Sequence, residues 1–258
     1  MPFAAGLYYF VHEVENATRP PVILIHGAGG THLNWPPQVR RLTGQPIYAV
    51  DLPGHGKSEG IGKQTIRDYA EDIVEFMKAL KFRAAVMIGH SMGGAIALLL
   101  ALYHSPRVIA LGLIGSGAKL RVAPAILDAA ADPATCQLAV HLITEASYAR
   151  ETEPRLKELG ERRMAETRST VLYGDLLGCD TFDILNELAG IRVPTLILCG
   201  AEDRMTPLNR SQTLRDNISG SDLRVVSNAG HMLMLERPNE VSSTLAEFLN
   251  SLSYQPGQ

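Results

Sequence analysis

Short apolar runs without polar interruption alternate with longer segments of helical spacing over most of the chain. Runs of this kind are typical of strands that are buried on both faces of a parallel sheet. The pattern predicts strands at residues 7–14, 22–25, 47–50, 84–88, 108–114, 193–200 and 223–226. Because strands and helices alternate, we expect a mostly parallel central sheet flanked by helices, which is the α/β class.

Helical spacing is clearest at residues 65–80, where the apolar side chains lie near one face. A run of small and apolar residues begins after Ser91 and ends near Pro106, which cannot continue a helix. Outside the middle of the chain, helices are predicted at 34–42, 65–80, 92–104, 207–218 and 239–252. Residues 253–258 are expected to form a frayed tail.

The alternation stops between residues 120 and 188, where no buried strand is evident. This stretch contains helix-like segments at 123–131, 134–148, 154–167 and 169–177. A crossover between two parallel strands needs only about a dozen residues, so one helix suffices for it. We therefore predict a core formed by residues 1–119 and 189–258, and a helical lid formed by residues 120–188.

The stretch Gly89-His90-Ser91-Met92-Gly93 joins a predicted strand to a predicted helix. A serine between two glycines fits a tight strand-to-helix turn that lifts the hydroxyl clear of the sheet. An isolated Gly-x-Ser-x-Gly can also be a helix N-cap. The strand before the motif and the small residues after it favour a nucleophile at Ser91.

A serine hydroxyl needs a base to accept its proton as it attacks, and imidazole titrates near operating pH. The chain has eight histidines. Those that lie in loops past predicted strand ends, and are not next to Ser91, are His26, His32, His55 and His231. Location alone leaves these alternatives open.

A carboxylate is needed to orient the base and to stabilise the imidazolium. Asp203 lies in the loop after the predicted strand at 193–200, and Glu202 is its rival. Either residue could instead be a solvated loop charge or a helix N-cap. The loop after the preceding strand carries Ser116 and no carboxylate. The order Ser91, Asp203, His231 differs from the orders in chymotrypsin and subtilisin.

In these motifs and their order, the whole chain resembles the α/β-hydrolase fold family, in particular its small lid-bearing esterases, haloperoxidases and C–C hydrolases. The matching stretches are His26-Gly27-Ala28-Gly29, Asp51-Leu52-Pro53-Gly54-His55-Gly56-Lys57-Ser58, Gly89-His90-Ser91-Met92-Gly93-Gly94, Gly200-x-x-Asp203 and Gly230-His231. The resemblance implies the α/β-hydrolase fold, with a helical lid inserted after the sixth core strand. It also implies Asp203 as the acid and His231 as the base.

Two backbone N–H groups are expected to stabilise the oxyanion that forms when Ser91 attacks. Met92, the residue after the nucleophile, supplies one of them, and the resemblance places the other at Ala28. The remaining candidate residues for substrate binding, or for support of the catalytic groups, are His26, Gly27, His90 and Met232. Some relatives use an aspartate at the position of Ser91 as the nucleophile. Because this chain carries serine there, the reactions of those relatives are not expected. Asp51 is expected to order the turn at 54–56.

Composition narrows the class of protein. The net charge is −3 and no basic block occurs, so nothing indicates nucleic acid binding. The apolar runs are too short to span a membrane, and the N-terminus does not resemble a signal peptide. The three cysteines are far apart, without the spacing of a metal site or a disulfide framework. We expect a cytoplasmic protein that uses neither a cofactor nor a metal, and its oligomeric state stays open.

The sequence thus predicts a serine hydrolase that cleaves carboxylic esters of small to medium acyl chain through an acyl-enzyme. Alternatives on the same triad are a lactonase, a C–C bond hydrolase and a cofactor-free haloperoxidase or perhydrolase. A ligand-binding receptor on this fold is the alternative outside enzymes. A C–C hydrolase that acts on acids needs a cationic pocket. The candidates in the predicted lid are Arg121, Arg150, Arg162, Arg163 and Arg168.

Overall fold

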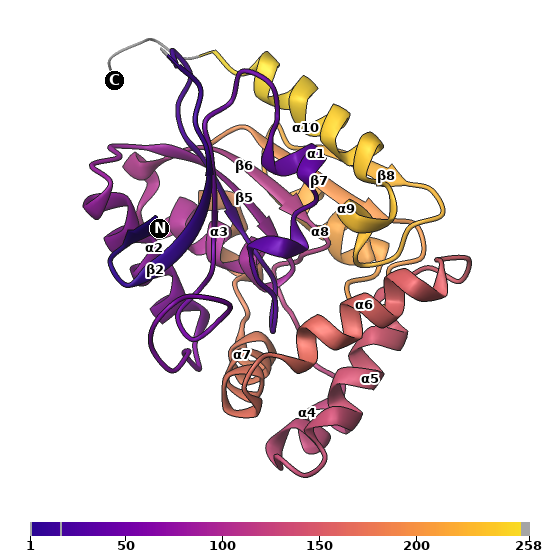
Figure 1. Ribbon diagram of the computed structural model, residues 1–258. Coiled ribbons are helices and arrows are strands. Elements are labelled where there is room, and N and C mark those ends of the chain that lie inside the picture. Colours follow the sequence, from indigo (N-terminus) through magenta and orange to yellow (C-terminus); the bar gives the residue numbers. More distant parts are fainter. Residues whose placement is uncertain (1, 16, 254–258) are drawn as a thin grey trace.

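An eight-stranded sheet runs through the computed structural model, which describes residues 2–15 and 17–253 (Figure 1). Its strands are β1 (Phe3–Ala4), β2 (Leu7–His12), β3 (Val22–Ile25), β4 (Ile47–Val50), β5 (Ala85–His90), β6 (Val108–Ile114), β7 (Thr195–Gly200) and β8 (Asp222–Val226). Their order across the sheet is β1-β2-β4-β3-β5-β6-β7-β8. The pairs β1–β2 and β2–β4 are antiparallel, and the remaining pairs are parallel. The carboxyl ends of β3 to β8 therefore meet at one edge.

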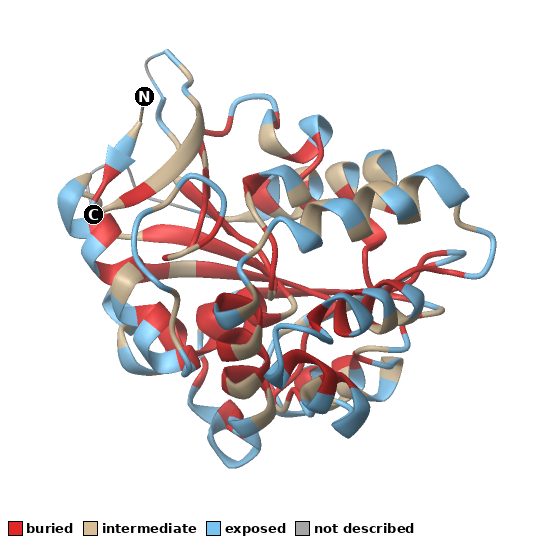
Figure 2. Cartoon of the chain, turned by 60° about the horizontal axis from the view of Figure 1, so that its bottom comes forward, coloured by how far each residue is buried: buried red, intermediate tan, exposed pale blue. Residues whose placement is uncertain are grey.

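The central strands are buried on both faces (Figure 2). In β3, Val22 and Leu24 pack in one apolar cluster, whereas Ile23 and Ile25 pack in the other. Helices α2 (Ile66–Ala79), α3 (Met92–Tyr103) and α8 (Leu208–Asn217) cover one face. Helices α1 (Pro37–Arg40), α9 (Leu233–Glu236) and α10 (Pro238–Ser251) cover the other. Short 3₁₀ helices are η1 (His32–Asn34), η2 (Ser105–Arg107) and η3 (Leu185–Gly190).

Between β6 and β7 the chain forms a helical segment at one end of the molecule (Figure 1). It contains α4 (Pro124–Ala131), α5 (Cys136–Ser147), α6 (Pro154–Ala165) and α7 (Ser169–Thr181). These helices share an apolar cluster of their own, which includes Ile126, Val140 and Leu172. The helices were expected here, but their role as a lid stays a prediction.

The predicted element bounds agree with the structure best where an apolar run is sharply limited. The strands expected at 22–25, 47–50 and 108–114 coincide with β3, β4 and β6. The helix expected at 34–42 is instead the turn η1 followed by α1, because Pro36 and Pro37 interrupt it. Strand β1 and helix α9 were not predicted, since elements of two and four residues carry too little periodicity. Most of the predicted tail, residues 254–258, lies outside the described residues.

Within the described ranges, no helix combines the length and hydrophobicity that crossing a membrane requires.

Candidate active site

Ser91 occupies the turn between β5 and α3 with a strained backbone. Its φ is +52° and its ψ is −116°, a conformation that is costly for a residue with a side chain. The turn needs glycine on both sides. A Cβ on Gly89 would lie 2.1 Å from the carbonyl oxygen of Gly93, and one on Gly93 would lie 2.1 Å from that of Ile25. The Ser91 side chain makes no capping hydrogen bond to α3, so the N-cap alternative does not describe it.

The backbone of Ser91 is held by the end of the neighbouring strand, β6. The Ser91 N–H donates to the Ile114 carbonyl at 2.9 Å. The Ser116 hydroxyl donates to the Ser91 carbonyl at 2.8 Å. From the sequence, Ser116 was notable only as a position without a carboxylate. In the structure, its hydroxyl helps to hold the strained residue in place.

Asp203 and His231 form a buried hydrogen-bonded pair. Asp203 follows β7 and His231 follows β8, and these strands are neighbours in the sheet. The distance from His231 Nδ1 to Asp203 Oδ2 is 2.9 Å, and both side chains are almost fully buried. An ionised carboxylate only accepts hydrogen bonds, so we assign the proton to Nδ1. This tautomer leaves Nε2 of His231 free to accept a proton, as a general base requires.

Asp203 is surrounded by donors that keep it ionised. Its Oδ1 accepts the N–H groups of Met205 and Thr206 at 2.9 and 2.8 Å, and its Oδ2 accepts the Thr206 hydroxyl at 2.8 Å. Burial alone would raise the pKa of Asp203, but His231 and these hydrogen bonds outweigh burial and lower it. Thr206 was not predicted from the sequence. Its signal was the spacing Asp203-x-x-Thr206, because an aspartate commonly accepts N–H groups a few residues further on.

Glu202, the rival acid, points elsewhere. Its Oε2 accepts the N–H of Arg150 at 2.9 Å, in the connection between α5 and α6. The structure therefore separates Glu202 from His231, whereas it brings Asp203 and His231 together.

His90 connects the His231 loop with the Ser91 turn. Its Nε2 donates to the His231 carbonyl at 3.0 Å, and the two imidazole rings lie 4.7 Å apart. Burial, together with His231, lowers the pKa of His90 to about 3. The His90 ring is thus neutral at physiological pH and adds no positive charge next to His231. Since Ser91 is the next residue, this contact holds the predicted base and nucleophile in one cluster.

The glycine-rich loop after β3 lies directly on the Ser91 turn. A Cβ on Gly27 would lie 3.1 Å from Ser91 Cβ, closer than ordinary van der Waals contact, so a side chain there would have to displace its neighbours. His26 holds the loop through both ring nitrogens. Its Nε2 accepts the Leu52 N–H at 3.0 Å, and its Nδ1 donates to the Gly27 carbonyl at 2.8 Å. Burial lowers the pKa of His26 to about 4, so its ring is also neutral.

The two N–H groups expected to form the oxyanion site are available as donors. Met92 is the first residue of α3, and the first N–H groups of a helix have no partner within the helix. Neither Met92 N–H nor Ala28 N–H donates to an acceptor among residues 2–15 and 17–253. Ala28 adjoins Gly27, the residue packed against Ser91.

Two of the other candidate bases, His32 and His55, are bonded to different carboxylates. Nδ1 of His32 lies 2.8 Å from Asp51 Oδ1, and Nε2 of His55 lies 2.8 Å from Asp175 Oδ2. Asp51 also accepts the Lys57 N–H at 3.0 Å, so it orders the turn at 54–56 as expected. Neither His32 nor His55 is paired with Asp203. Asp175, on α7, was missed in the sequence analysis.

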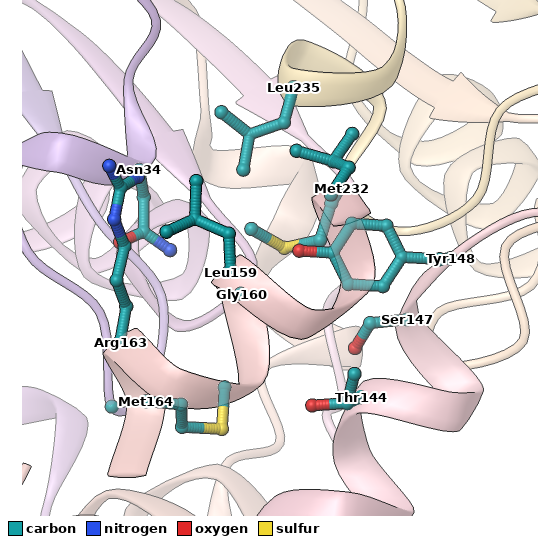
Figure 3. A pocket seen from close by; sticks show the side chains of 12 residues that line it. Asn34, Thr144, Ser147, Tyr148, Leu159, Gly160, Arg163, Met164, Met232 and Leu235 are labelled. Atoms are coloured by element: carbon teal, nitrogen blue, oxygen red, sulfur yellow. The ribbon is translucent and has the colours of Figure 1, made fainter. Parts of the chain in front are cut away.

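A pocket lies beside this site, between the helical segment and the core (Figure 3). It is lined by Gly29, Asn34, Thr144, Ser147, Tyr148, Leu156, Leu159, Gly160, Arg163, Met164, Met232 and Leu235. Met232, which follows His231, thus faces the pocket. Of the arginines proposed from the sequence, Arg163 is the one that lines this pocket. Its guanidinium donates to the Leu33 carbonyl at 3.5 Å, and it has no carboxylate partner among the described residues.

The site contains no candidate for metal binding. In the part of the chain that the structure describes, no three His, Cys, Asp or Glu side chains cluster in a way that could hold a metal ion.

Comparison with known proteins shows the family to which the chain belongs. The family model described as the alpha/beta hydrolase fold matches residues 20–238. A 3-oxoadipate enol-lactonase of Acinetobacter baylyi is 26% identical over 94% of this chain and 92% of its own length. The structure of a thermophilic esterase is 31% identical, with a TM-score of 0.82, over 96% of this chain and 99% of the esterase. The enol-lactonase structure from Burkholderia xenovorans is 24% identical, with a TM-score of 0.90, over 97% of this chain and 100% of its own. The chain therefore belongs to the α/β-hydrolase fold family.

Proposed function

We propose that this hydrolase cleaves carboxylic esters of small to medium acyl chain through an acyl-enzyme on Ser91. The observation that carries the proposal is the buried Asp203–His231 pair, whose loop is tied through His90 to the strained turn of Ser91. The tautomer that we assign to His231 is the one a general base needs. The serine hydroxyl is not used as a helix cap. A thermophilic esterase among the similar structures supports this reaction class.

The first half of the reaction forms the acyl-enzyme. His231 Nε2 accepts the proton of Ser91 as Oγ attacks the acyl carbon, and Asp203 stabilises the imidazolium that results. The N–H groups of Ala28 and Met92 stabilise the negative charge on the acyl oxygen. Loss of one such donor typically costs about 10²–10³ in rate. His231 then protonates the leaving alcohol as the C–O bond breaks.

The second half of the reaction releases the acid. His231 accepts a proton from water, which attacks the acyl carbon of the ester on Ser91. The same two N–H groups stabilise the second oxyanion. When this intermediate collapses, Ser91 recovers its proton from His231. In this proposal the helical segment 120–188 acts as a lid, and its pocket takes part of the substrate.

A second candidate is a lactone or C–C hydrolase for substrates that carry a carboxylate. The observation that favours it is Arg163, whose guanidinium lines the pocket without a carboxylate partner among the described residues. In Figure 3, Arg163 and Asn34 lie on one side of the pocket, and the Tyr148 hydroxyl points into it. A guanidinium binds a carboxylate by two parallel hydrogen bonds. The similarity to a 3-oxoadipate enol-lactonase supports this alternative.

Hydrolysis of p-nitrophenyl esters, from acetate to octanoate, tests the first proposal. We expect turnover by the wild-type protein, loss of turnover in Ser91→Ala, and labelling of the wild type alone by a fluorophosphonate. If the wild type and Ser91→Ala give equal rates on every ester and lactone, the catalytic proposal fails and a ligand-binding role is favoured.

The second candidate is tested with Arg163→Gln and two matched substrates. The substrates are p-nitrophenyl butyrate, which is neutral, and the p-nitrophenyl monoester of adipic acid, which carries a carboxylate too far from the ester to expel p-nitrophenolate by itself. If Arg163 binds the acid, KM for the monoester rises about 10-fold in Arg163→Gln and KM for butyrate changes little. The control is Arg162→Gln, an exposed arginine of the same helix. Equal effects of both variants would contradict acid recognition by Arg163.

A further inference from the structure

We propose that Asp175 is a positioning residue for the oxyanion site: from helix α7, and with its partner His55, it holds Gly29 so that the neighbouring Ala28 N–H points at the acyl oxygen. The inference rests on the proposed serine hydrolase function. It assigns to the helical segment a part in catalysis besides covering the pocket.

Asp175 is a buried carboxylate with its hydrogen bonds supplied from three separate elements. Its Oδ2 accepts the Gly29 N–H at 2.9 Å and the His55 ring at 2.8 Å. Its Oδ1 accepts the Tyr69 hydroxyl, from helix α2, at 2.5 Å. Asp175 and His55 are both fully buried. A carboxylate is seldom buried without ionised or hydrogen-bonded partners, and this one has both.

The His55 ring is charged, because each of its two nitrogens faces a hydrogen-bond acceptor. Its Nε2 faces the Asp175 carboxylate, and its Nδ1 lies 3.0 Å from the Pro53 carbonyl. Both of these partners are acceptors, so both ring nitrogens of His55 must donate, which is the imidazolium form. Asp175 and His55 thus form an ion pair that joins α7 to the loop after β4.

The titratable groups around the pair are neutral or are engaged elsewhere. The His26 ring, 4.9 Å from that of His55, is neutral. Burial raises the pKa values of Tyr69 and of Cys179, so both keep their protons. Asp51 is occupied by His32 and by the Lys57 N–H. The charge of Asp175 is therefore matched mainly by His55.

The loop around Ala28 is fixed on both sides. On one side, the Gly27 carbonyl accepts from His26 Nδ1 and from the Gly30 N–H, at 2.8 and 3.0 Å. On the other, the Gly29 N–H donates to Asp175, and the Gly29 carbonyl accepts the Thr167 hydroxyl at 3.0 Å. Asp175 and Thr167 both belong to the helical segment. Gly29 has a φ of +61°, so its orientation is set by these contacts and by the absence of a side chain.

Ala28 lies between these two fixed residues and keeps its own N–H unbonded within the described chain. Catalysis by an oxyanion donor depends on its orientation before the charge forms, because reorientation during the reaction costs free energy. Loss of the Asp175 carboxylate releases one end of the Ala28–Gly29 peptide. It should therefore lower the rate of the chemical step more than it weakens substrate binding.

The first variant is Asp175→Asn, which keeps the shape of the side chain and removes its charge. We expect kcat for p-nitrophenyl butyrate to fall about 10- to 100-fold, with KM changed less than about 3-fold, part of the cost of a lost oxyanion donor. The Ki of a short alkyl trifluoromethyl ketone, which forms a tetrahedral adduct with serine, should rise by a similar factor. The assay is run well below the unfolding temperature of each variant.

The matched control is Asp180→Asn. Asp180 lies on the same helix, and its Oδ1 accepts the Val122 N–H at 3.1 Å, away from the oxyanion loop. We expect kcat and KM of this variant to stay near those of the wild type. A fall in kcat shared by both variants, or a change in KM alone in Asp175→Asn, would overturn the inference.

Two measurements keep the test decisive if Asp175→Asn does not fold. Thr167→Val removes the hydroxyl on the Gly29 carbonyl, and kcat should fall several-fold without a matching change in KM. An unchanged kcat in this variant would count against positioning of Gly29 by the segment. Nitrogen-15 spectra of the wild type should show His55 with both ring nitrogens protonated near pH 7. A neutral His55 would remove the charged pair on which the inference stands.

The variants distinguish a failure of the proposed serine hydrolase function from a failure of the positioning role of Asp175. Equal activity of the wild type and Ser91→Ala refutes the serine hydrolase itself. Activity that depends on Ser91, together with a normal kcat in Asp175→Asn, refutes only the positioning role of Asp175.

Discussion

The hydroxyl of Thr206 donates a 2.8 Å hydrogen bond to Oδ2 of Asp203, the same oxygen that lies 2.9 Å from Nδ1 of His231. Thr206 thus contacts both members of the buried pair, since its Oγ1 is 3.3 Å from His231 Nδ1. Its contribution can be measured without altering either member.

Replacement of Thr206 by valine keeps the shape of the side chain and removes the donor. Because a hydrogen bond to a charged group contributes roughly 1.5–3 kcal/mol, we expect kcat/KM to fall about 10- to 150-fold. The control is Thr213→Val on α8, whose exposed hydroxyl bonds only within its helix. Equal losses in the two variants would contradict a specific role for Thr206.

The same variant should change acid stability. The pKa of Asp203 is lowered in the folded protein, so its contribution to stability is present above the unfolded value of about 3.9. That contribution is lost as the pH falls through the folded pKa. Without the Thr206 donor the folded pKa rises, so the midpoint of acid unfolding should move to higher pH, as followed by circular dichroism.

Ser116 gives a second prediction, on the backbone of the nucleophile. In Ser116→Ala the Ser91 carbonyl loses its 2.8 Å hydrogen bond, and the strained turn loses one of its restraints. We expect kcat to fall several-fold while KM stays within about 2-fold, because a typical hydrogen bond contributes about 1 kcal/mol. Ser242→Ala, whose hydroxyl is exposed on α10, is the control. A wild-type kcat in Ser116→Ala would show that the turn needs no such support.

His55 predicts a loss of stability at alkaline pH. Burial would lower the pKa of His55, but the charge and hydrogen bond of Asp175 outweigh burial and raise it. The stabilisation is thus complete below the unfolded value of about 6.5 and is lost as the pH rises through the folded pKa. The Tm of the wild type should fall more steeply between about pH 6 and pH 9 than that of His55→Gln.

At about pH 6, His55→Gln itself should lower Tm on the order of 10 °C, because it leaves the Asp175 charge buried without its partner. The control is His141→Gln, an exposed histidine that faces Glu161. If the wild type and His55→Gln show parallel curves of Tm against pH, His55 does not carry the charge assigned to it.

Glu236 predicts an effect on the loop that carries His231. Its Oε1 accepts the Gly230 N–H at 2.9 Å, and its Oε2 accepts the Ala149 N–H at 2.9 Å. An amide at this position turns a donor toward one of the two N–H groups. Glu236→Gln should therefore lower Tm and reduce kcat several-fold, whereas the exposed Glu240→Gln should change neither. Scanning calorimetry and ester hydrolysis measure the two effects.

The sequence predicted the fold and the candidate triad because their signals are local. Ser91 and Asp203 follow β5 and β7, which are buried throughout, and His231 follows the edge strand β8, which is mostly exposed. The structure brings Asp203 and His231 into contact because β7 and β8 are neighbours, and the catalytic roles stay predictions.

The supporting contacts were beyond the reach of the sequence for a physical reason. Asp175 lies 146 residues from Gly29, in a helix without any motif, and the two residues meet only through tertiary packing. Glu236 meets Ala149 in the same way, across 87 residues. Glycine and serine at a turn are restricted by local backbone geometry, whereas a buried carboxylate is recognised only by its three-dimensional partners.

Helix α6 differs from its neighbours in the helical segment, because none of its residues is fully buried. It lines the pocket and reaches the core through a long hydrogen bond, 3.5 Å from Arg163 to the Leu33 carbonyl. Shorter hydrogen bonds to the core come from Asp175 on α7, from Thr167 after α6 and from the 149–152 connection before α6. Regions with few buried contacts open locally at low free-energy cost. The amides of α6 should therefore exchange with deuterium much faster than those of α7. Substrate would then enter by local unfolding of this one helix, while the oxyanion loop keeps its catalytic form.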